Sequence, residues 1–376
     1  DDAGPARMSG RGEVKGKKLE MTIKTGGTEV VRAIELKKPP VLRSTLGPML
    51  SREDMVAGKV INYQVFDPLT QQDQDIEIEV VGPAMVVVFD KEVPVTHIRQ
   101  KVAGLELNGW INQRGEMLRQ ELGLGLTAVR ETEEQARFGL NGGTSGADLV
   151  SATMVEVKGL PPRLKTWKQL SLEISGVDLS TFDLNDDRQS LKDQRITITR
   201  ETQLDGLERP VIAGDLAPAE SLSPGALIQA DHPRIINATR GVLGDELDTV
   251  VSARKIMKWI HDRMEQVPVA GIPSAIEVLD TRIGDCNEHS TLFAAMARSA
   301  GIPTRMVVGL VYKEGRFGYH AWNEVLGAAG WISVDSTWNQ LPADVGHLAF
   351  LRGGLKEQVR LLPLMGRIKL KKVNGP

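Results

Sequence analysis

The N-terminal half of the chain shows the alternation of apolar and polar residues that is typical of β-strands. In residues 18–24 (KLEMTIK) every second side chain is apolar, so one face of the predicted strand is apolar as well. A Gly-Gly pair at 26–27 predicts a turn into a second strand over 28–36. Similar patterns predict further strands at 76–81, 84–89, 170–174 and 195–200.

Beyond residue 225 the apolar positions recur at helical spacing. Residues 246–266 place apolar side chains on one face and predict an amphipathic helix. A short helix is predicted at 274–279 and a longer one from Cys286. Three predicted strands follow, at 304–312, 317–326 and 331–335. Helices followed by an antiparallel meander are typical of α+β domains, so we predict an α+β protein with a β-rich N-terminal part.

A segment between these two patterns predicts a domain boundary. Residues 204–225 contain several Pro, Gly and acidic residues with little periodicity, as linkers do. We therefore expect a β-rich domain over 1–210 and a second domain over 211–376. The stretch 141–146 (NGGTSG) predicts a flexible turn that divides the first domain into two halves, and Thr132 predicts a helix start shortly before it.

Composition and charge narrow the classes of function. The 376 residues are 41% hydrophobic and 25% charged, as in an ordinary globular protein. A net charge of -3 and an aromatic content of 4% argue against nucleic-acid binding, which needs a basic face and stacking side chains. No apolar run has the length of a membrane span.

The cysteine count bears on the compartment. A single cysteine excludes an intramolecular disulfide, which fits a reducing compartment and equally an exported protein that avoids stray thiols. Because the sequence begins without Met, we expect an exported, periplasmic protein whose leader is absent from this sequence. A cytoplasmic location stays open.

The only cysteine, Cys286, lies where a helix is predicted to begin. Asp285 is a suitable N-cap, and Glu288 three residues later completes a capping box. The helix ends at Gly301 and Pro303. The thiol is thus at the first helical position, where unpaired N–H groups and the helix dipole favour a thiolate and can hold an oxyanion. A lone cysteine is more often an inert core residue, but the polar neighbours here favour a nucleophile.

A nucleophilic cysteine needs an imidazole base, and the imidazole needs a third group that orients it. His320 is the best candidate base, because its predicted strand is joined by a short turn to the next strand. Asp335, at the end of that next strand, falls opposite Trp322 or one residue away. In the first register it is diagonal to His320 on the same face and within reach of it. We therefore predict Cys286, His320 and Asp335 as a catalytic triad.

Other chemistry is open at the same residues. His289 is a competing base, but its offset from Cys286 places it on the apolar face of the helix, which favours a buried supporting role. Cys286 and His289 also have the spacing of two zinc ligands, with His320 and Asp335 as the obvious further ligands. Zinc sites of this mixed composition are uncommon, so we expect no metal and no other cofactor.

Short motifs surround the three predicted triad residues. They are GDCNEH (284–289), AGIPTR (300–305), GYHAWNEV (318–325), WISVDST (331–337), QLPAD (340–344), GHL (346–348) and LMGR (364–367). Together they resemble the core of bacterial transglutaminase-like proteins over residues 246–371, a third of the chain. The resemblance implies a papain-like core, with helices packed on an antiparallel sheet, and a triad at Cys286, His320 and Asp335.

Two features separate the chain from the animal transglutaminases, which cross-link glutamine to lysine. Those enzymes have Gln and Trp beside the nucleophile, whereas Asp285 and Asn287 flank Cys286 here. They also depend on calcium, and no Asp/Asn-rich loop suited to calcium is evident. The resemblance therefore implies thiol-dependent acyl transfer on an amide or peptide through an acyl-enzyme, by hydrolysis or by transamidation.

A second class of function stays open, a binding or scaffold protein whose transglutaminase-like domain is catalytically silent. The β-rich half would then be the interaction module, although the intact triad residue types count against it. Trp322, beside the predicted triad, is expected either to line the substrate cleft or to lie in the core. The expected partner is a protein or peptide-like substrate, with no nucleic acid and no membrane span.

Overall fold

A computed structural model of the chain describes residues 9–25, 28–36, 39–67, 72–88, 91–102, 105–123, 126–135, 154–212, 214, 217–267, 274–353 and 359–373. Over these residues the chain is α+β with a β-rich N-terminal part, as the sequence predicts. The turns expected at 26–27 and 141–146 lie outside the described residues. None of the described helices combines the length and the apolar composition that crossing a bilayer requires.

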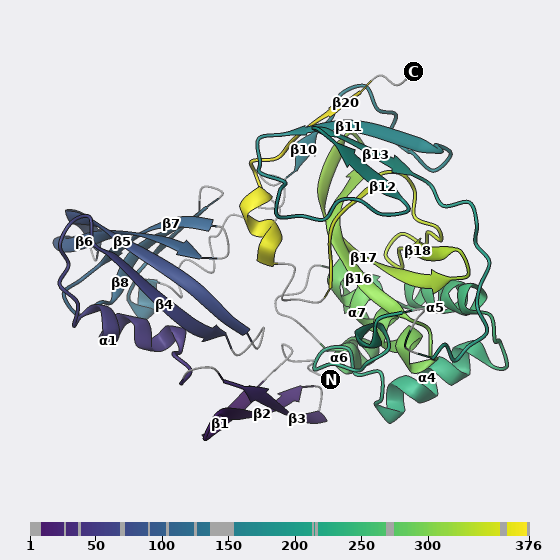
Figure 1. Ribbon diagram of the computed structural model, residues 1–376, viewed down its shortest axis with the longest axis horizontal. Coiled ribbons are helices and arrows are strands. Elements are labelled where there is room, and N and C mark those ends of the chain that lie inside the picture. Colours follow the sequence, from purple (N-terminus) through teal and green to yellow (C-terminus); the bar gives the residue numbers. More distant parts are fainter. Residues whose placement is uncertain are drawn as a thin grey trace.

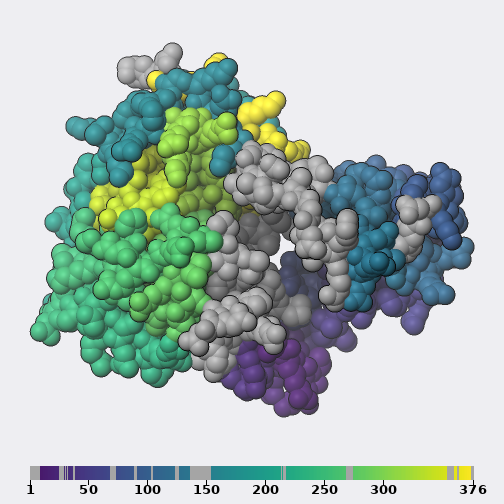
Figure 2. All heavy atoms as spheres, turned by 180° about the vertical axis from the view of Figure 1, so that it is seen from behind, coloured from purple at the N-terminus to yellow at the C-terminus, as the bar shows by residue number. Residues whose placement is uncertain are grey.

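The N-terminal part contains two antiparallel sheets, on the left and at the bottom of Figure 1. The smaller sheet consists of β1 (Ser9–Lys15), β2 (Lys18–Thr25) and β3 (Thr28–Glu35). After the short helix α1 (Leu46–Leu50) a meander of six strands follows, made of β4 (Val60–Asp67), β5 (Gln72–Val88), β6 (Lys91–Val102), β7 (Leu105–Ile111), β8 (Met117–Gly123) and β9 (Leu126–Val129). Its own core includes Ile78 and Ile98, and it forms a lobe of its own in Figure 2.

The prediction of separate strands at 76–81 and 84–89 was wrong, because both belong to the single strand β5. The register shifts between Val80 and Gly82, where the chain forms a bulge. Gly82 has a φ of 145°, a conformation that glycine adopts without strain. Strand β6 pairs with β5 on both sides of the bulge, so the Gly-Pro step does not end the strand.

Within the described residues from 217 to 299, four helices precede the C-terminal strands, namely α4 (Pro233–Leu243), α5 (Thr249–Arg263), α6 (Ala275–Thr281) and α7 (Cys286–Ser299). Helix α5 is the one predicted at 246–266, and it begins later because Asp248 caps it by accepting the N–H groups of Val250 and Val251. The sequence did not predict α4. The two-residue strands β14 (Glu265–Gln266) and β15 (Ile283–Gly284) form a parallel pair that guides the chain into α7.

The C-terminal sheet is formed by β10 (Val155–Glu156), β16 (Thr304–Lys313), β17 (Arg316–Gly327), β18 (Gly330–Val334) and β19 (His347–Arg352). Its order is β10-β17-β16-β19, with β18 also paired to β17. Phe293 and Met296 of α7 share a core with Val325 of β17. The helices gather at one end of the long strands β16 and β17 (Figure 1).

A four-stranded sheet lies at the other end of these long strands (Figure 1). It consists of β11 (Gln169–Ser175), β12 (Gln189–Lys192), β13 (Arg195–Thr199) and β20 (Lys369–Lys372), in the order β12-β13-β11-β20. Its side chains share a core with Phe317 and Phe350 of the C-terminal sheet. Because β11 pairs with β20, this sheet joins residues from both sides of the domain boundary expected at 210. The boundary itself stays a prediction.

Candidate active site

Cys286 is the first residue of α7. Asp285 is the N-cap, and its carboxylate accepts the N–H of Asn287 at 3.0 Å. In return the carboxylate of Glu288 accepts the N–H of Asp285 at 2.9 Å, which completes the capping box. The thiol is half-buried, and it lies at the positive end of the helix dipole.

Glycine is required immediately before this cap. A Cβ atom on Gly284 would lie 2.2 Å from the Cβ of Glu288, far inside van der Waals contact. The close approach of the chain to the side chain of Glu288 is therefore possible only without a side chain at residue 284. The order Gly-Asp-Cys in the sequence thus provides the close approach, the cap and the thiol in turn.

Replacement of Glu288 by Gln is expected to stabilise the protein near pH 8 more than near pH 5. Burial, followed by the hydrogen bond and the charge of Asp285, raises the pKa of Glu288 to about 7. The stability that this group contributes is therefore present below its unfolded pKa of about 4.3 and is lost as the pH rises to about 7. Glu288→Gln keeps the acceptor for Asp285 and removes the charge. Thermal unfolding at both pH values measures the difference, and a difference that does not change with pH contradicts the prediction.

His320 lies on β17, and Asp335 directly follows the neighbouring strand β18. Of the two registers that the sequence allows, the structure has the first, with Asp335 opposite Trp322. Asn323 pairs with Val334, so Asp335 follows opposite Trp322. The Nε2 atom of His320 lies 2.9 Å from Oδ2 of Asp335. Both side chains are buried, and Asp335 is fully so.

Backbone groups hold the other oxygen of Asp335. Its Oδ1 accepts the N–H of Thr337 at 2.8 Å and the N–H of Trp338 at 3.2 Å. Two backbone hydrogen bonds between Asp335 and Gln340 close the turn that contains these groups. The turn therefore fixes the carboxylate and leaves Oδ2 for imidazole groups.

The side chain of Cys286 lies close enough to the ring of His320 to raise the pKa of that ring. Because Nε2 is bonded to Asp335, Nδ1 is the ring nitrogen that is left to face the thiol. Burial alone lowers the pKa of His320, but the charge and hydrogen bond of Asp335, together with those of Cys286, raise it to about 9. Burial raises the pKa of Asp335, yet the charges and hydrogen bonds of two histidines hold that pKa well below its usual range. The pair therefore stabilises a protonated His320.

One buried amide fixes α7 against β17. The Nδ2 of Asn323 donates to the backbone oxygen of Ser290 at 3.1 Å, and Ser290 lies about one helical turn beyond Cys286. Asn323 is on the same strand as His320, three residues further on. This hydrogen bond therefore helps to set the separation between the thiol and the imidazole.

Two tryptophans lie against the ring of His320. Trp338, which the sequence did not single out, stacks on it with 4.8 Å between ring centroids. The ring of Trp322 lies 6.1 Å away. Trp322 is only 1% exposed and packs with Val307 and Ala349, which favours the core role among the two that the sequence allows.

His289 supports the start of α7, in agreement with the role expected for it. Its Nδ1 lies 2.7 Å from the backbone oxygen of Asp285, and the side chain is fully buried. Burial lowers the pKa of His289, so the neutral ring donates its Nδ1–H to that oxygen. The described residues whose ligand atoms lie close enough together to share a metal ion do not include Cys286 and His289.

Sequence reasoning did not single out His347, the first residue of β19. Its Nε2 lies 3.0 Å from the same Oδ2 of Asp335 that His320 contacts. The side chain is fully buried. The only signal for it in the sequence is its place in the GHL motif at 346–348.

Comparison with known proteins agrees with the motifs. Residues 236–336 match the family model of the transglutaminase-like superfamily, and no curated protein matches the sequence. Among solved structures, a candidate cysteine protease from Cytophaga hutchinsonii shares 16% identity over 55% of this chain and 86% of its own, with a TM-score of 0.36. A candidate protease from Parabacteroides distasonis shares 11% identity over 44% of this chain and 39% of its own, with a TM-score of 0.24. Residues 236–336 are thus similar to the transglutaminase-like superfamily.

Proposed function

We propose that the chain is a cysteine acyltransferase or hydrolase that acts on the carbonyl of an amide or peptide. The observation that carries the proposal is the contact of Cys286, at the start of α7, with a histidine that Asp335 holds at 2.9 Å. The match to the transglutaminase-like superfamily supports the same class of reaction. Packing of α7 on the strand that bears His320 supports a papain-like arrangement of the domain.

In the first half of the proposed reaction, the thiol of Cys286 gives its proton to Nδ1 of His320. The sulfur then bonds to the substrate carbonyl carbon, and the carbonyl oxygen becomes an oxyanion. The cap side chain of Asp285 accepts the N–H groups of Asn287 and Glu288, which leaves the N–H of Cys286 outside the cap. We therefore assign the backbone N–H of Cys286 itself as a donor to the oxyanion.

Collapse of this intermediate breaks the carbon–nitrogen bond. His320 gives its proton to the leaving amine, and the acyl group stays on Cys286 as a thioester. Water, or a second amine, then loses a proton to His320 and attacks the thioester, which releases the thiol. We favour water as the acceptor, because the sequence shows neither a calcium switch nor an evident amine site.

The proposal is tested by the rate at which iodoacetamide alkylates Cys286 as a function of pH. The unmodified chain is expected to react fast well below pH 8, because the thiolate forms by proton transfer to His320. His320→Ala is expected to remove this advantage. The single cysteine makes the readout unambiguous, because no other thiol competes. If the alkylation rates of both proteins depend on pH as that of a free thiol does, with a midpoint at pH about 8.5, the proposal fails. The catalytically silent scaffold is then favoured.

A further inference from the structure

A second histidine shares the carboxylate of Asp335 with His320. The Nε2 atoms of His320 and His347 lie 2.9 and 3.0 Å from the same Oδ2 atom. The two rings are 5.9 Å apart and meet edge to face at 67°. Since Oδ1 is occupied by two backbone N–H groups, both imidazoles must bind at a single oxygen.

The partners of His347 determine its protonation state. Its Nδ1 lies 3.2 Å from the backbone oxygen of Asp344 and 3.3 Å from Oδ1 of the same residue. A backbone carbonyl oxygen only accepts, so Nδ1 carries a proton. Nε2 faces a carboxylate oxygen that His320 also contacts, so it carries a proton as well. The ring of His347 is therefore an imidazolium between two carboxylates.

The electrostatics of the site agree with this assignment. Burial lowers the pKa of His347, but the hydrogen bonds and charges of Asp335 and Asp344 outweigh it and raise the pKa. The titratable and charged groups around the ring come from several elements and are Asp335, Asp344, His320, Arg188 and Lys313. The two carboxylates contact the ring directly, whereas Arg188 is held to the backbone of Asp344 and Lys313 lies 5.7 Å over the ring of Trp338.

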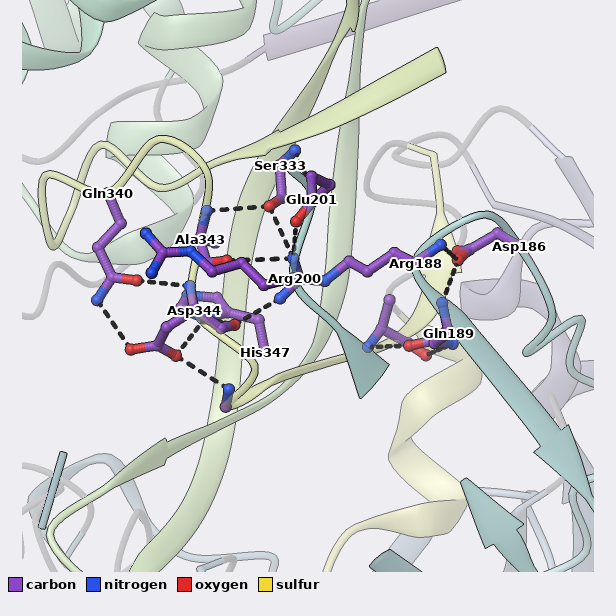
Figure 3. A network of polar contacts seen from close by, with 12 residues as sticks. Asp186, Arg188, Gln189, Arg200, Glu201, Ser333, Gln340, Ala343, Asp344 and His347 are labelled. Atoms are coloured by element: carbon purple, nitrogen blue, oxygen red, sulfur yellow. Dashed lines mark hydrogen bonds and ion pairs between the residues drawn. The ribbon is translucent and has the colours of Figure 1, made fainter. Parts of the chain in front are cut away.

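A buried arginine fixes the loop that carries Asp344. The guanidinium of Arg188 donates to the backbone oxygen of Ala343 at 3.1 Å and to that of Asp344. It also pairs with Glu201. Figure 3 shows this network, which extends from Arg188 through Asp344 to His347. The position of His347 is therefore determined by the four-stranded sheet as well as by β19.

We propose, on the basis of the function proposed above, that His347 is a positioning residue, a buried cation that anchors Asp335 and opposes the positive charge on His320. His347 does not reach the reacting atoms. It acts because like charges at this separation repel each other in a buried site. The repulsion helps His320 to release its proton to the leaving amine.

The first test changes the charge and keeps the hydrogen bond. His347→Gln retains an N–H donor toward Asp335 and removes the cation. Iodoacetate carries a negative charge, so it alkylates Cys286 faster when the neighbouring His320 is protonated. The rate therefore falls at high pH, and the plot of rate against pH has an alkaline limb where His320 loses its proton. We expect His347→Gln to move this limb to higher pH by about 1 unit or more. The control His97→Gln, in the N-terminal meander, should leave it in place, and an unmoved limb in His347→Gln overturns the inference.

The second test needs no variant. With six histidines in the chain, nitrogen NMR of the imidazole groups can resolve each ring, and through-bond correlation of each ring with its own backbone amide identifies His347. Near neutral pH we expect protons on both nitrogens of His347. A single proton on that ring overturns the inference.

The two proposals fail in different ways. Failure of the proposed function appears as alkylation of Cys286 that does not depend on His320. The inference about His347 fails if NMR finds a single proton on its ring. It also fails if His347→Gln leaves the alkaline limb in place while alkylation of Cys286 still depends on His320. The NMR result is obtained without reference to catalysis.

Discussion

Asp335→Asn is expected to slow the acylation of Cys286 by up to about 10⁴-fold, the loss seen when the carboxylate of a Ser-His-Asp triad becomes an amide. The asparagine oxygen can still accept the N–H groups of Thr337 and Trp338. Its NH₂ group then faces Nε2 of His320, and that nitrogen must accept a hydrogen bond. The proton of the neutral ring moves to Nδ1, which can no longer take the proton of the thiol.

A burst assay with a nitrophenyl ester measures this loss, because the leaving group reports each acylation. Asp248→Asn is a matched control, since Asp248 also accepts two backbone N–H groups, at the start of α5. That variant should lower stability by about 1 kcal/mol or less and leave the acylation rate unchanged. An Asp335→Asn protein that acylates within tenfold of the unmodified chain would contradict the role given to Asp335.

Arg188→Met is expected to lower the free energy of unfolding by about 3 to 5 kcal/mol. The side chain is 5% exposed and pairs with Glu201, whose side chain is 12% exposed. It also donates to the hydroxyl of Ser333 at 3.1 Å and to two backbone oxygens of the 343–344 loop. Methionine fills a similar volume but leaves the Glu201 carboxylate without a cation and the loop oxygens without donors.

Urea unfolding measures the effect, and the chain offers a control for the loss of a cation. Lys258 pairs with Asp262 at 2.8 Å on the exposed face of α5, so Lys258→Met should cost about 0.5 kcal/mol or less. Arg188→Lys should recover only part of the loss, because one ammonium group cannot reproduce the planar set of donors. A loss below about 1 kcal/mol in Arg188→Met would show that the network contributes little to stability.

The sequence was sufficient to predict the parts of the site that depend on local rules. The capping box at Asp285 and Glu288 determines the start of α7, and the short turn at 328–329 limits the pairing to two registers, the first of which brings Asp335 to His320. These features need only neighbouring residues. The prediction that two separate strands meet near Gly82 failed for the opposite reason. Pairing with β6 continues through the local break in the pattern and keeps the two segments in one strand.

His347 and Arg188 could not be predicted in the same way. His347 begins a strand that pairs with β16 rather than with the strand before it in the chain, so no hairpin signal indicates which residues face it. Arg188 contacts a loop about 155 residues further along the chain, and a buried arginine has no local pattern. Both positions depend on the assembled sheets, which local patterns of hydrophobicity do not specify.

The pairing of β20 with β11 has a consequence for the order of events during synthesis. Residues 369–372 complete the sheet that holds Arg188, and they are translated after Cys286, His320 and Asp335. A nascent chain that has already exposed all three still lacks the strand that closes this sheet. Contacts between such distant segments form late and slowly. The thiol is therefore expected to gain its full reactivity only after residues 369–372 have been synthesised.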